Sequence, residues 1–323
     1  MISRRLIRIK VLQMAYSHVR TEDKDLAITE KELINKSIKS STDLYYLTIS
    51  LLSDLKYMAA KRIDAARNKY IPTESDLNPN MRFVENPVIL KIEQSPEYKR
   101  YISNNVISWD NDETLSYFYN KLTNSNFYAK YMNLESPTFK DHIDFTVRIM
   151  SDVIMNDEIF YQCTEEKNIY WNDDYSVVMP AVLRTLKRIT EEDDIIFDNT
   201  PLARELYRDN ADDLAESIEF AKVLLRRTVL DRKNYTELIA PHAVNWKIER
   251  MSEMDRLIMD MAITEWLNFE EIPIKVTINE YLDIAKAYSS EKSNAFINGV
   301  LDKILSDLKE SGKIHKSGRG LIG

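Results

Sequence analysis

Three arginines near the start of the chain, Arg4, Arg5 and Arg8, are the residues whose type and spacing point most directly to binding chemistry. A 3.6-residue period predicts an amphipathic first helix with Lys10 and Gln13 on its polar face. Cations at a helix start oppose the helix dipole and cost roughly a few tenths of a kcal/mol each, so stability does not explain them. A phosphate group is bound there by free backbone N–H groups and by the forked donors of arginine. A flexible basic terminus without a role is the alternative interpretation.

Glycine is almost absent, and Gly299 is the first of only five in the chain. Phosphate-cradling loops need several glycines at fixed spacing, so most nucleotide enzymes are excluded. The sequence also has no HExxH motif, no cysteine pair and no Gly-x-Ser-x-Gly elbow. We therefore expect a protein that is not an enzyme, with no catalytic residue, no cofactor and no metal site. A glycine inside a helix costs about 1 kcal/mol relative to alanine, so Gly299 suggests close approach of another backbone or a ligand.

Composition indicates an ordinary globular protein of 323 residues, with 44% apolar and 30% charged residues. No apolar run approaches the roughly 20 residues that span a bilayer, and the first residues lack the pattern of a secretory signal. The lone Cys163 excludes an internal disulfide framework and fits a reducing compartment. We expect a cytoplasmic protein that makes no membrane contact.

Charge is unevenly distributed along the chain, although the net charge is −8. The first 20 residues hold five basic residues and no acid, and residues 303–323 hold five basic residues against two acids. Such asymmetry indicates where partners bind rather than which fold forms.

Apolar residues recur at helical spacing through most of the chain, and no segment shows sustained alternation, so we expect an all-α fold. Prolines between residues 71 and 111 indicate a long irregular connection, and Pro180 is expected near a helix end. The predicted helices of the first two thirds cover residues 43–70, 112–133, 138–161, 175–190 and 201–230.

Three further helices are predicted after residue 250, each with its own start and stop signals. The first has a capping box at Ser252 and Asp255 and extends to about Leu267. The second has a capping box at Thr277 and Glu280 and a hydrophobic staple of Val276 and Tyr281. The third extends from near Ser293 to Gly312.

The two ends of the chain together resemble the NusB family of bacterial transcription antitermination factors. The resemblance rests on Arg4-Arg5-x-x-Arg8 with Val11-Leu12-Gln13-x-x-Tyr16, on Met254-Asp255-Arg256, on Val276-x-Ile278-Asn279-Glu280 and on Phe296-Ile297-Asn298-Gly299-Val300-Leu301-Asp302. It covers about 20 residues at the start and about 90 at the end. The portion between about 21 and 215 is longer than a compact member of the family needs, so we interpret it as a family-atypical helical expansion.

The resemblance implies a NusB-like helical bundle of two subdomains with an enlarged N-terminal half. We accordingly expect an N-terminal helical region at 1–215, a C-terminal NusB-like subdomain at 216–310 and a flexible basic tail at 311–323. It further implies binding of the single-stranded boxA element of ribosomal RNA leader transcripts together with NusE, a small-subunit ribosomal protein. That complex joins an elongating RNA polymerase and allows ribosomal RNA operons to be read through.

Residue by residue, the resemblance implies two surfaces. The RNA-binding surface comprises Arg4, Arg5, Arg8, Lys10, Gln13, Lys292, Ser293, Phe296 and Asn298, and the surface facing NusE comprises Asp255, Arg256 and Glu265. Phe296 also has the spacing of a core residue, in register with Val300 and Ile304. The chain departs from the family at Ile9, Asp260 and Lys292.

A protein-interaction scaffold without RNA binding is the alternative function. The chain has 18 tyrosines, many of them in the middle portion, and tyrosine is enriched both at interfaces and in helical cores. The two functions differ in whether Arg4, Arg5 and Arg8 govern RNA affinity.

Overall fold

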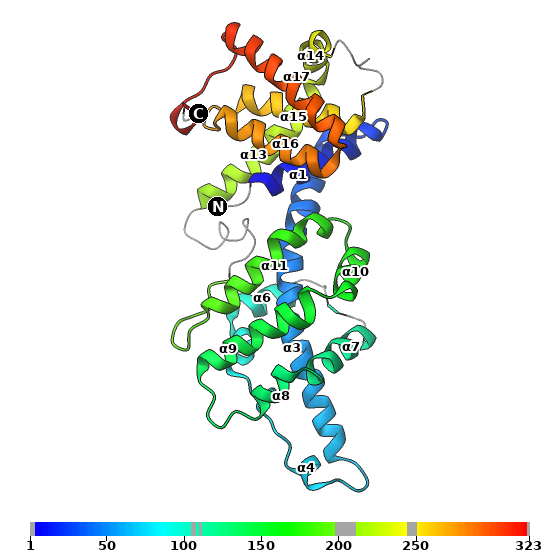
Figure 1. Ribbon diagram of the computed structural model, residues 1–323, viewed down its shortest axis with the longest axis vertical. Coiled ribbons are helices and arrows are strands. Elements are labelled where there is room, and N and C mark those ends of the chain that lie inside the picture. The colour runs from blue at the N-terminus through cyan, green and yellow to red at the C-terminus, as the bar shows by residue number, and fades with distance from the viewer. Residues whose placement is uncertain (1–3, 105–107, 110–111, 198–210, 244–250, 322–323) are drawn as a thin grey trace. The chain divides into compact units, whose positions relative to one another are not determined.

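The computed structural model describes residues 4–104, 108–109, 112–197, 211–243 and 251–321. Every regular element in these ranges is a helix (Figure 1), so the predicted all-α class is confirmed. None of the helices in these ranges is long and apolar enough to cross a membrane.

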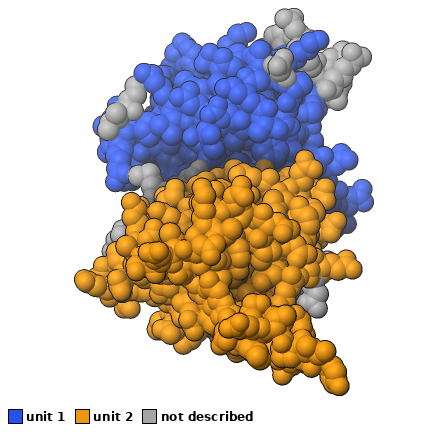
Figure 2. All heavy atoms as spheres, turned by 60° about the horizontal axis from the view of Figure 1, so that its bottom comes forward, with its two compact units in different colours: residues 1–38, 210–323 blue, residues 39–209 orange. Residues whose placement is uncertain are grey.

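The chain divides into two compact units, coloured separately in Figure 2. Unit 1 consists of residues 1–38 and 210–323, and unit 2 consists of residues 39–209. This division differs from the predicted one, which placed residues 1–215 together. The first helix belongs with the last third of the chain because it packs against helices that follow residue 210.

Unit 1 is a bundle in which α15 is the most deeply buried helix. Helix α1 packs against α13 and α15, and α16 packs against α15 and α17. The elements of unit 1 are α1 (Arg4–Arg20), α2 (Leu26–Glu32), η1 (Leu33–Ile38), α13 (Ala211–Leu230), α14 (Arg232–Ile239), η3 (Ala240–His242), α15 (Glu253–Asn268), α16 (Ile274–Tyr288), α17 (Glu291–Glu310) and η5 (Gly318–Leu321).

Unit 2 is built around the long helix α3, against which α5, α6, α7 and α11 pack (Figure 1). Its core runs from Leu44 to Phe197 and includes many aromatic side chains. The elements of unit 2 are α3 (Lys39–Arg67), α4 (Glu74–Leu77), α5 (Pro87–Gln94), α6 (Pro96–Asn104), α7 (Asp112–Thr123), α8 (Asn126–Met132), α9 (Phe139–Arg148), η2 (Ile149–Met155), α10 (Glu158–Lys167) and α11 (Trp171–Arg188).

The helix predicted at 43–70 corresponds to α3, but two longer predictions are divided by local capping. Ser125 accepts a hydrogen bond from the Tyr128 amide and separates α7 from α8. Asp157 accepts one from the Ile159 amide and starts α10 after η2. Such side-chain acceptors stabilise a new helix start and so interrupt an otherwise helical pattern. Pro180 lies inside α11, not near its end, and residues 201–210 of the last predicted helix lie outside the described residues.

In the last third of the chain, the predicted helix start at Ser252 and the predicted helix stop at Gly312 are confirmed. The other two helices start at residues different from the predicted ones. Ser252 caps α15 by accepting from the Asp255 amide. Helix α16 begins at Ile274 after Pro273, so the predicted capping box and staple at 276–281 are wrong. The reason is that Thr277 lies inside the helix, where its hydroxyl donates to the Glu265 carboxylate 2.8 Å away. Helix α17 begins at Glu291, directly after Ser290, whose hydroxyl caps the helix by accepting a hydrogen bond from the Ser293 amide.

Candidate functional site

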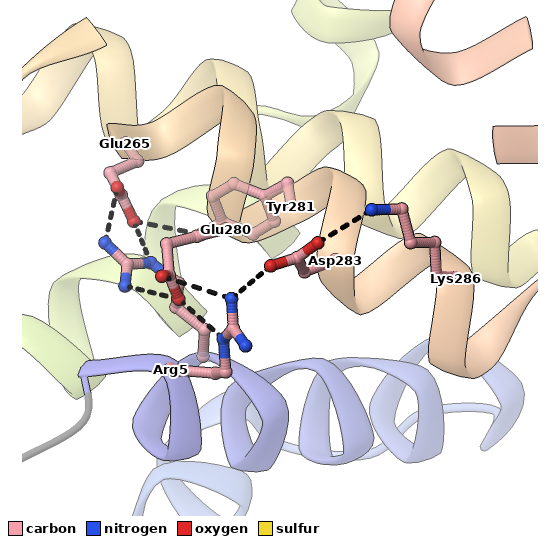
Figure 3. Close-up of polar contacts among 7 residues, drawn as sticks. Arg5, Glu265, Glu280, Tyr281, Asp283 and Lys286 are labelled. Carbon is pink, nitrogen blue, oxygen red and sulfur yellow. Dashed lines mark hydrogen bonds and ion pairs between the residues drawn. The ribbon is translucent and has the colours of Figure 1, made fainter. Parts of the chain in front are cut away.

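The start of α1 faces carboxylates contributed by three other helices of unit 1. Arg4 forms an ion pair with Glu216 of α13. Arg5 donates from Nε to Glu280 at 3.0 Å and from Nη2 to Asp283 at 2.5 Å, both on α16 (Figure 3). The positive charges of Arg4 and Arg5 are therefore balanced by carboxylates within unit 1.

Arg8 is the centre of a buried network rather than a surface group. Its Nε and Nη2 atoms each donate to one oxygen of Glu265 at 2.7 Å, a bidentate pair whose side chains are 3% and 0% exposed. Tyr281 donates its hydroxyl to the same carboxylate at 3.1 Å. Burial by itself lowers the pKa of Arg8, but the charge of Glu265 and its hydrogen bonds more than offset this and hold the pKa above its ordinary value. Arg8 is thus permanently charged and permanently paired.

Arg8 and Lys10, which the sequence predicts to contact RNA, are buried, since both residues are only about 1–2% exposed. A side chain without accessible donors cannot neutralise a phosphate in solvent. Arg4 and Arg5 remain accessible, with side chains 38% and 42% exposed. Exposed ion pairs of this kind contribute about 0–1 kcal/mol, so a phosphate group can replace the carboxylate partner at little cost.

Gln13 lies on α1 and is partly buried, and the other four predicted RNA-binding residues lie on α17, whose first turns are joined to α16. Asn294 donates its side-chain amide to the Leu282 carbonyl at 2.8 Å. Lys292 and Asn298 are exposed, whereas Ser293 and Phe296 are partly buried. Helix α16 therefore connects the two parts of the predicted surface, because Arg5 contacts its residues 280 and 283.

The surface predicted to face NusE is largely inaccessible. Glu265 is fully buried beneath Arg8, and Asp255 is 5% exposed and accepts a hydrogen bond from Ser289. Both carboxylates are therefore engaged by contacts within unit 1. Arg256 is partly exposed, and its guanidinium donates to Thr236 of α14.

Beneath Arg256 lies a buried carboxylate that the sequence marked only as a departure from the family. Asp260 is 0% exposed and sits 3.6 Å from Nε of Arg232 and 4.0 Å from Nε of Arg256. Burial raises its pKa to about 7, although the charges of the two arginines oppose the rise. The two arginines also line an open pocket of about 620 Å³, together with Lys233, Thr236, Glu237 and Glu253.

Sequence reasoning identified the arginines but not their partners. The i,i+4 spacing of Arg256 and Asp260 was a usable signal for a pair on one helix face. No comparable signal connects Arg8 with Glu265, which lies far along the chain, because pairing at that separation depends on how α1 packs on α15. Among the described residues, no group of histidine, cysteine, aspartate and glutamate side chains has the arrangement of a metal site.

The geometry defines a class: an all-helical domain in which the first helix is fastened to the last third of the chain by arginine–carboxylate pairs. Residues 180–306 match the model of the NusB family, so this part of the chain is a NusB-family domain. The family expectation from the sequence is confirmed.

Several curated relatives are similar to part of the chain. "Transcription antitermination protein NusB" of Salinibacter ruber (strain DSM 13855 / M31) is 48% identical over 105 residues, which is 32% of this chain and 66% of that protein. The protein of the same name in Chloroherpeton thalassium (strain ATCC 35110 / GB-78) is 49% identical over 84 residues, covering 26% and 40%. That of Clostridium botulinum (strain Alaska E43 / Type E3) is 47% identical over 88 residues, covering 27% and 66%.

The chain thus spans between 40% and 66% of the length of these relatives. All three are named as transcription factors and none as an enzyme, in agreement with the expectation of a non-enzymatic protein. No solved structure matches the chain.

Proposed function

We propose that the protein is a non-enzymatic transcription antitermination factor that acts in the cytoplasm by binding boxA-type single-stranded RNA. The observation that carries the proposal is the similarity to relatives named for antitermination, at 47–49% identity. The accessible Arg4 and Arg5 support it, because their exposed ion pairs exchange readily for phosphate.

In this proposal Arg4 and Arg5 contact phosphates, and the exposed part of α17 extends the RNA surface through Lys292 and Asn298. Gln13, Ser293 and Phe296 are partly buried and have supporting roles. Arg8 acts indirectly, because its pair with Glu265 holds α1 against α15 and so positions the two accessible arginines. NusE binds alongside the RNA and contacts the accessible Arg256, and the complex joins an elongating RNA polymerase.

The alternative scaffold function receives less support from the tyrosines than the sequence suggested. Tyr98, Tyr119 and Tyr131 of the middle portion are buried in the core of unit 2, where they satisfy packing rather than offer a partner surface. Tyr57 and Tyr70 of unit 2 have exposed fractions of 69% and 100%, so these two tyrosines are accessible to a partner.

The test is fluorescence anisotropy with a labelled boxA RNA and a scrambled RNA, with and without NusE, over a series of salt concentrations. We expect selective binding that NusE tightens. The Arg4→Ala/Arg5→Ala variant should flatten the slope of log affinity against log salt by about 0.7 per lost contact, which amounts to about a tenfold loss of affinity at 0.15 M salt.

The matched control is Arg226→Ala/Arg227→Ala on α13, which also removes two exposed, ion-paired arginines from unit 1. It should leave RNA affinity unchanged. Equal effects of the two double variants would contradict a specific role of Arg4 and Arg5. Absence of binding by the unmodified chain would overturn the proposed function.

A further inference from the structure

The segment after α17, residues 313–321, is basic and was expected to be a flexible tail. It contains Lys313, Lys316 and Arg319 and no acid. Helix α17 ends at Glu310, the positive φ of 64° at Gly312 then reverses the chain, and the Lys313 amide donates back to the Leu308 carbonyl at 2.9 Å. This is a Schellman turn, which directs the segment back along the bundle.

Hydrogen bonds to two backbone carbonyls hold this segment against the connection between α15 and α16. The Ser317 amide donates to the Glu270 carbonyl at 3.2 Å, and Lys316 Nζ donates to the Phe269 carbonyl at 2.8 Å. Gly320 is buried, and a Cβ atom there would lie 1.8 Å from the Glu270 carbonyl oxygen. Only glycine fits at this position, so the segment is anchored in a defined place, contrary to the expectation of a flexible tail.

Contacts between neighbouring residues connect the anchored segment with the start of α1. The Phe269 ring packs on the Phe220 ring, with centroids 4.7 Å apart. The guanidinium carbons of Arg4 and Arg8 lie 5.3 and 5.6 Å from the centroid of that Phe220 ring. Lys316 therefore contacts the Phe269 backbone, the Phe269 ring contacts the Phe220 ring, and the Phe220 ring contacts the arginines of the first helix.

The balance of charge at this end of the unit depends on the segment. The three arginines of α1 are paired with the four carboxylates Glu216, Glu265, Glu280 and Asp283, so they supply no excess positive charge by themselves. Lys313 and Arg319 are exposed, and within the described ranges neither lies within ion-pair distance of a carboxylate. Their charge is therefore available to a polyanion.

We propose that residues 313–321 form a second cationic strand of the RNA-binding surface, with Lys313 and Arg319 contacting phosphates beside those held by Arg4 and Arg5. The inference rests on the proposed RNA-binding function and adds a segment to it. Single-stranded RNA is the partner class because such RNA is bound along a positively charged surface that follows its backbone, and each phosphate neutralised by an exposed lysine or arginine releases counterions from the RNA.

The experiment uses the full chain and the labelled boxA RNA, with two variants of different kinds. Lys313→Ala/Arg319→Ala removes charge and leaves the anchor. Gly320→Ala keeps every charge but displaces the segment from Glu270. The control Lys303→Ala/Lys309→Ala removes two exposed lysines from α17 and the same net charge. Circular dichroism and thermal unfolding establish that each variant is folded.

We expect Lys313→Ala/Arg319→Ala to weaken binding about tenfold at 0.15 M salt and to flatten the salt slope by about 1.4, the sum for two contacts. Gly320→Ala should weaken binding severalfold with its charge intact, and the control should bind as the unmodified chain does. Loss of binding in the Arg4→Ala/Arg5→Ala variant without loss in either segment variant would overturn this inference alone. Equal weakening by the control would attribute the effect to net charge and overturn it as well. If the unmodified chain binds no RNA, the proposed function itself fails.

Discussion

Arg5 and Arg8 lie three residues apart on one helix, yet their environments assign them opposite roles. Arg8 is enclosed with Glu265, while Arg5 is 42% exposed beside Glu280 and Asp283. Removing one member of a buried pair leaves an uncompensated charge and costs about 3–5 kcal/mol, whereas an exposed pair contributes about 0–1 kcal/mol. The same residue type is therefore structural at one position and available for binding at the other.

We predict that Arg8→Met lowers the free energy of unfolding by about 3–5 kcal/mol and that Arg5→Met lowers it by less than about 1 kcal/mol. Urea unfolding of the full chain, followed by circular dichroism, measures both. The double variant Arg8→Met/Glu265→Leu should recover much of the loss, because it removes the isolated carboxylate. Similar losses for the two single variants would contradict the distinction.

Asp260 gives the unit a dependence on pH. Its folded-state pKa of about 7 lies above its ordinary value of 3.8, so between about pH 4 and 7 the folded chain holds a proton that the unfolded chain has released. A state that binds more protons is favoured at low pH, so the contribution of Asp260 to stability falls as pH rises through this window and is constant above about pH 7.

We predict that Asp260→Asn flattens the pH dependence of unfolding between pH 5 and 7, where the unmodified residue contributes a slope of up to about 1.4 kcal/mol per pH unit. Urea unfolding of both proteins at matched pH values measures the difference, and contributions common to both proteins, such as those of histidines, cancel. A constant difference across pH 5–8 would show that Asp260 does not titrate there.

At the scale of elements, Gly299 and Gly312 differ in backbone conformation. Gly312 has a positive φ of 64° in the turn that ends the helix. Gly299 lies inside the helix, and a Cβ atom added there would meet nothing within 4 Å in the described structure. No other part of the described structure therefore approaches Gly299 closely. Of the two explanations that the sequence suggested, another backbone or a ligand, the ligand remains.

We predict that Gly312→Ala lowers stability by about 1 kcal/mol and that Gly299→Ala raises it by about 0.5–1 kcal/mol. The midpoints of thermal unfolding should shift in opposite directions. If RNA or NusE approaches Gly299 closely, the same Gly299→Ala variant will bind its partner more weakly despite its greater stability. Unchanged binding would leave Gly299 without a role in partner approach.

At the scale of the molecule, unit 2 carries its own core. The cluster from Leu44 to Phe197 lies entirely within residues 39–209, and unit 1 is formed from the segments on either side. A unit with its own hydrophobic core can in principle fold alone.

We predict that a fragment of residues 39–209 is helical and unfolds cooperatively in urea, because its buried side chains are all supplied by itself. Circular dichroism of the isolated fragment tests this. The fragment should show no selective binding of boxA RNA, since Arg4, Arg5 and residues 313–321 are absent from it. Selective binding by the fragment would transfer RNA recognition to unit 2 and support the alternative function.

The sequence by itself determined the helical class, most helix positions and the family. Helical spacing, the side-chain cap at Ser252 and the glycine stop at Gly312 are local features, set by residues within one or two turns of each other. The tertiary structure decided which arginines are free. Whether Arg8 faces RNA or Glu265, and whether residues 313–321 move freely or rest on Glu270, depends on contacts between helices distant in sequence, which no local pattern specifies.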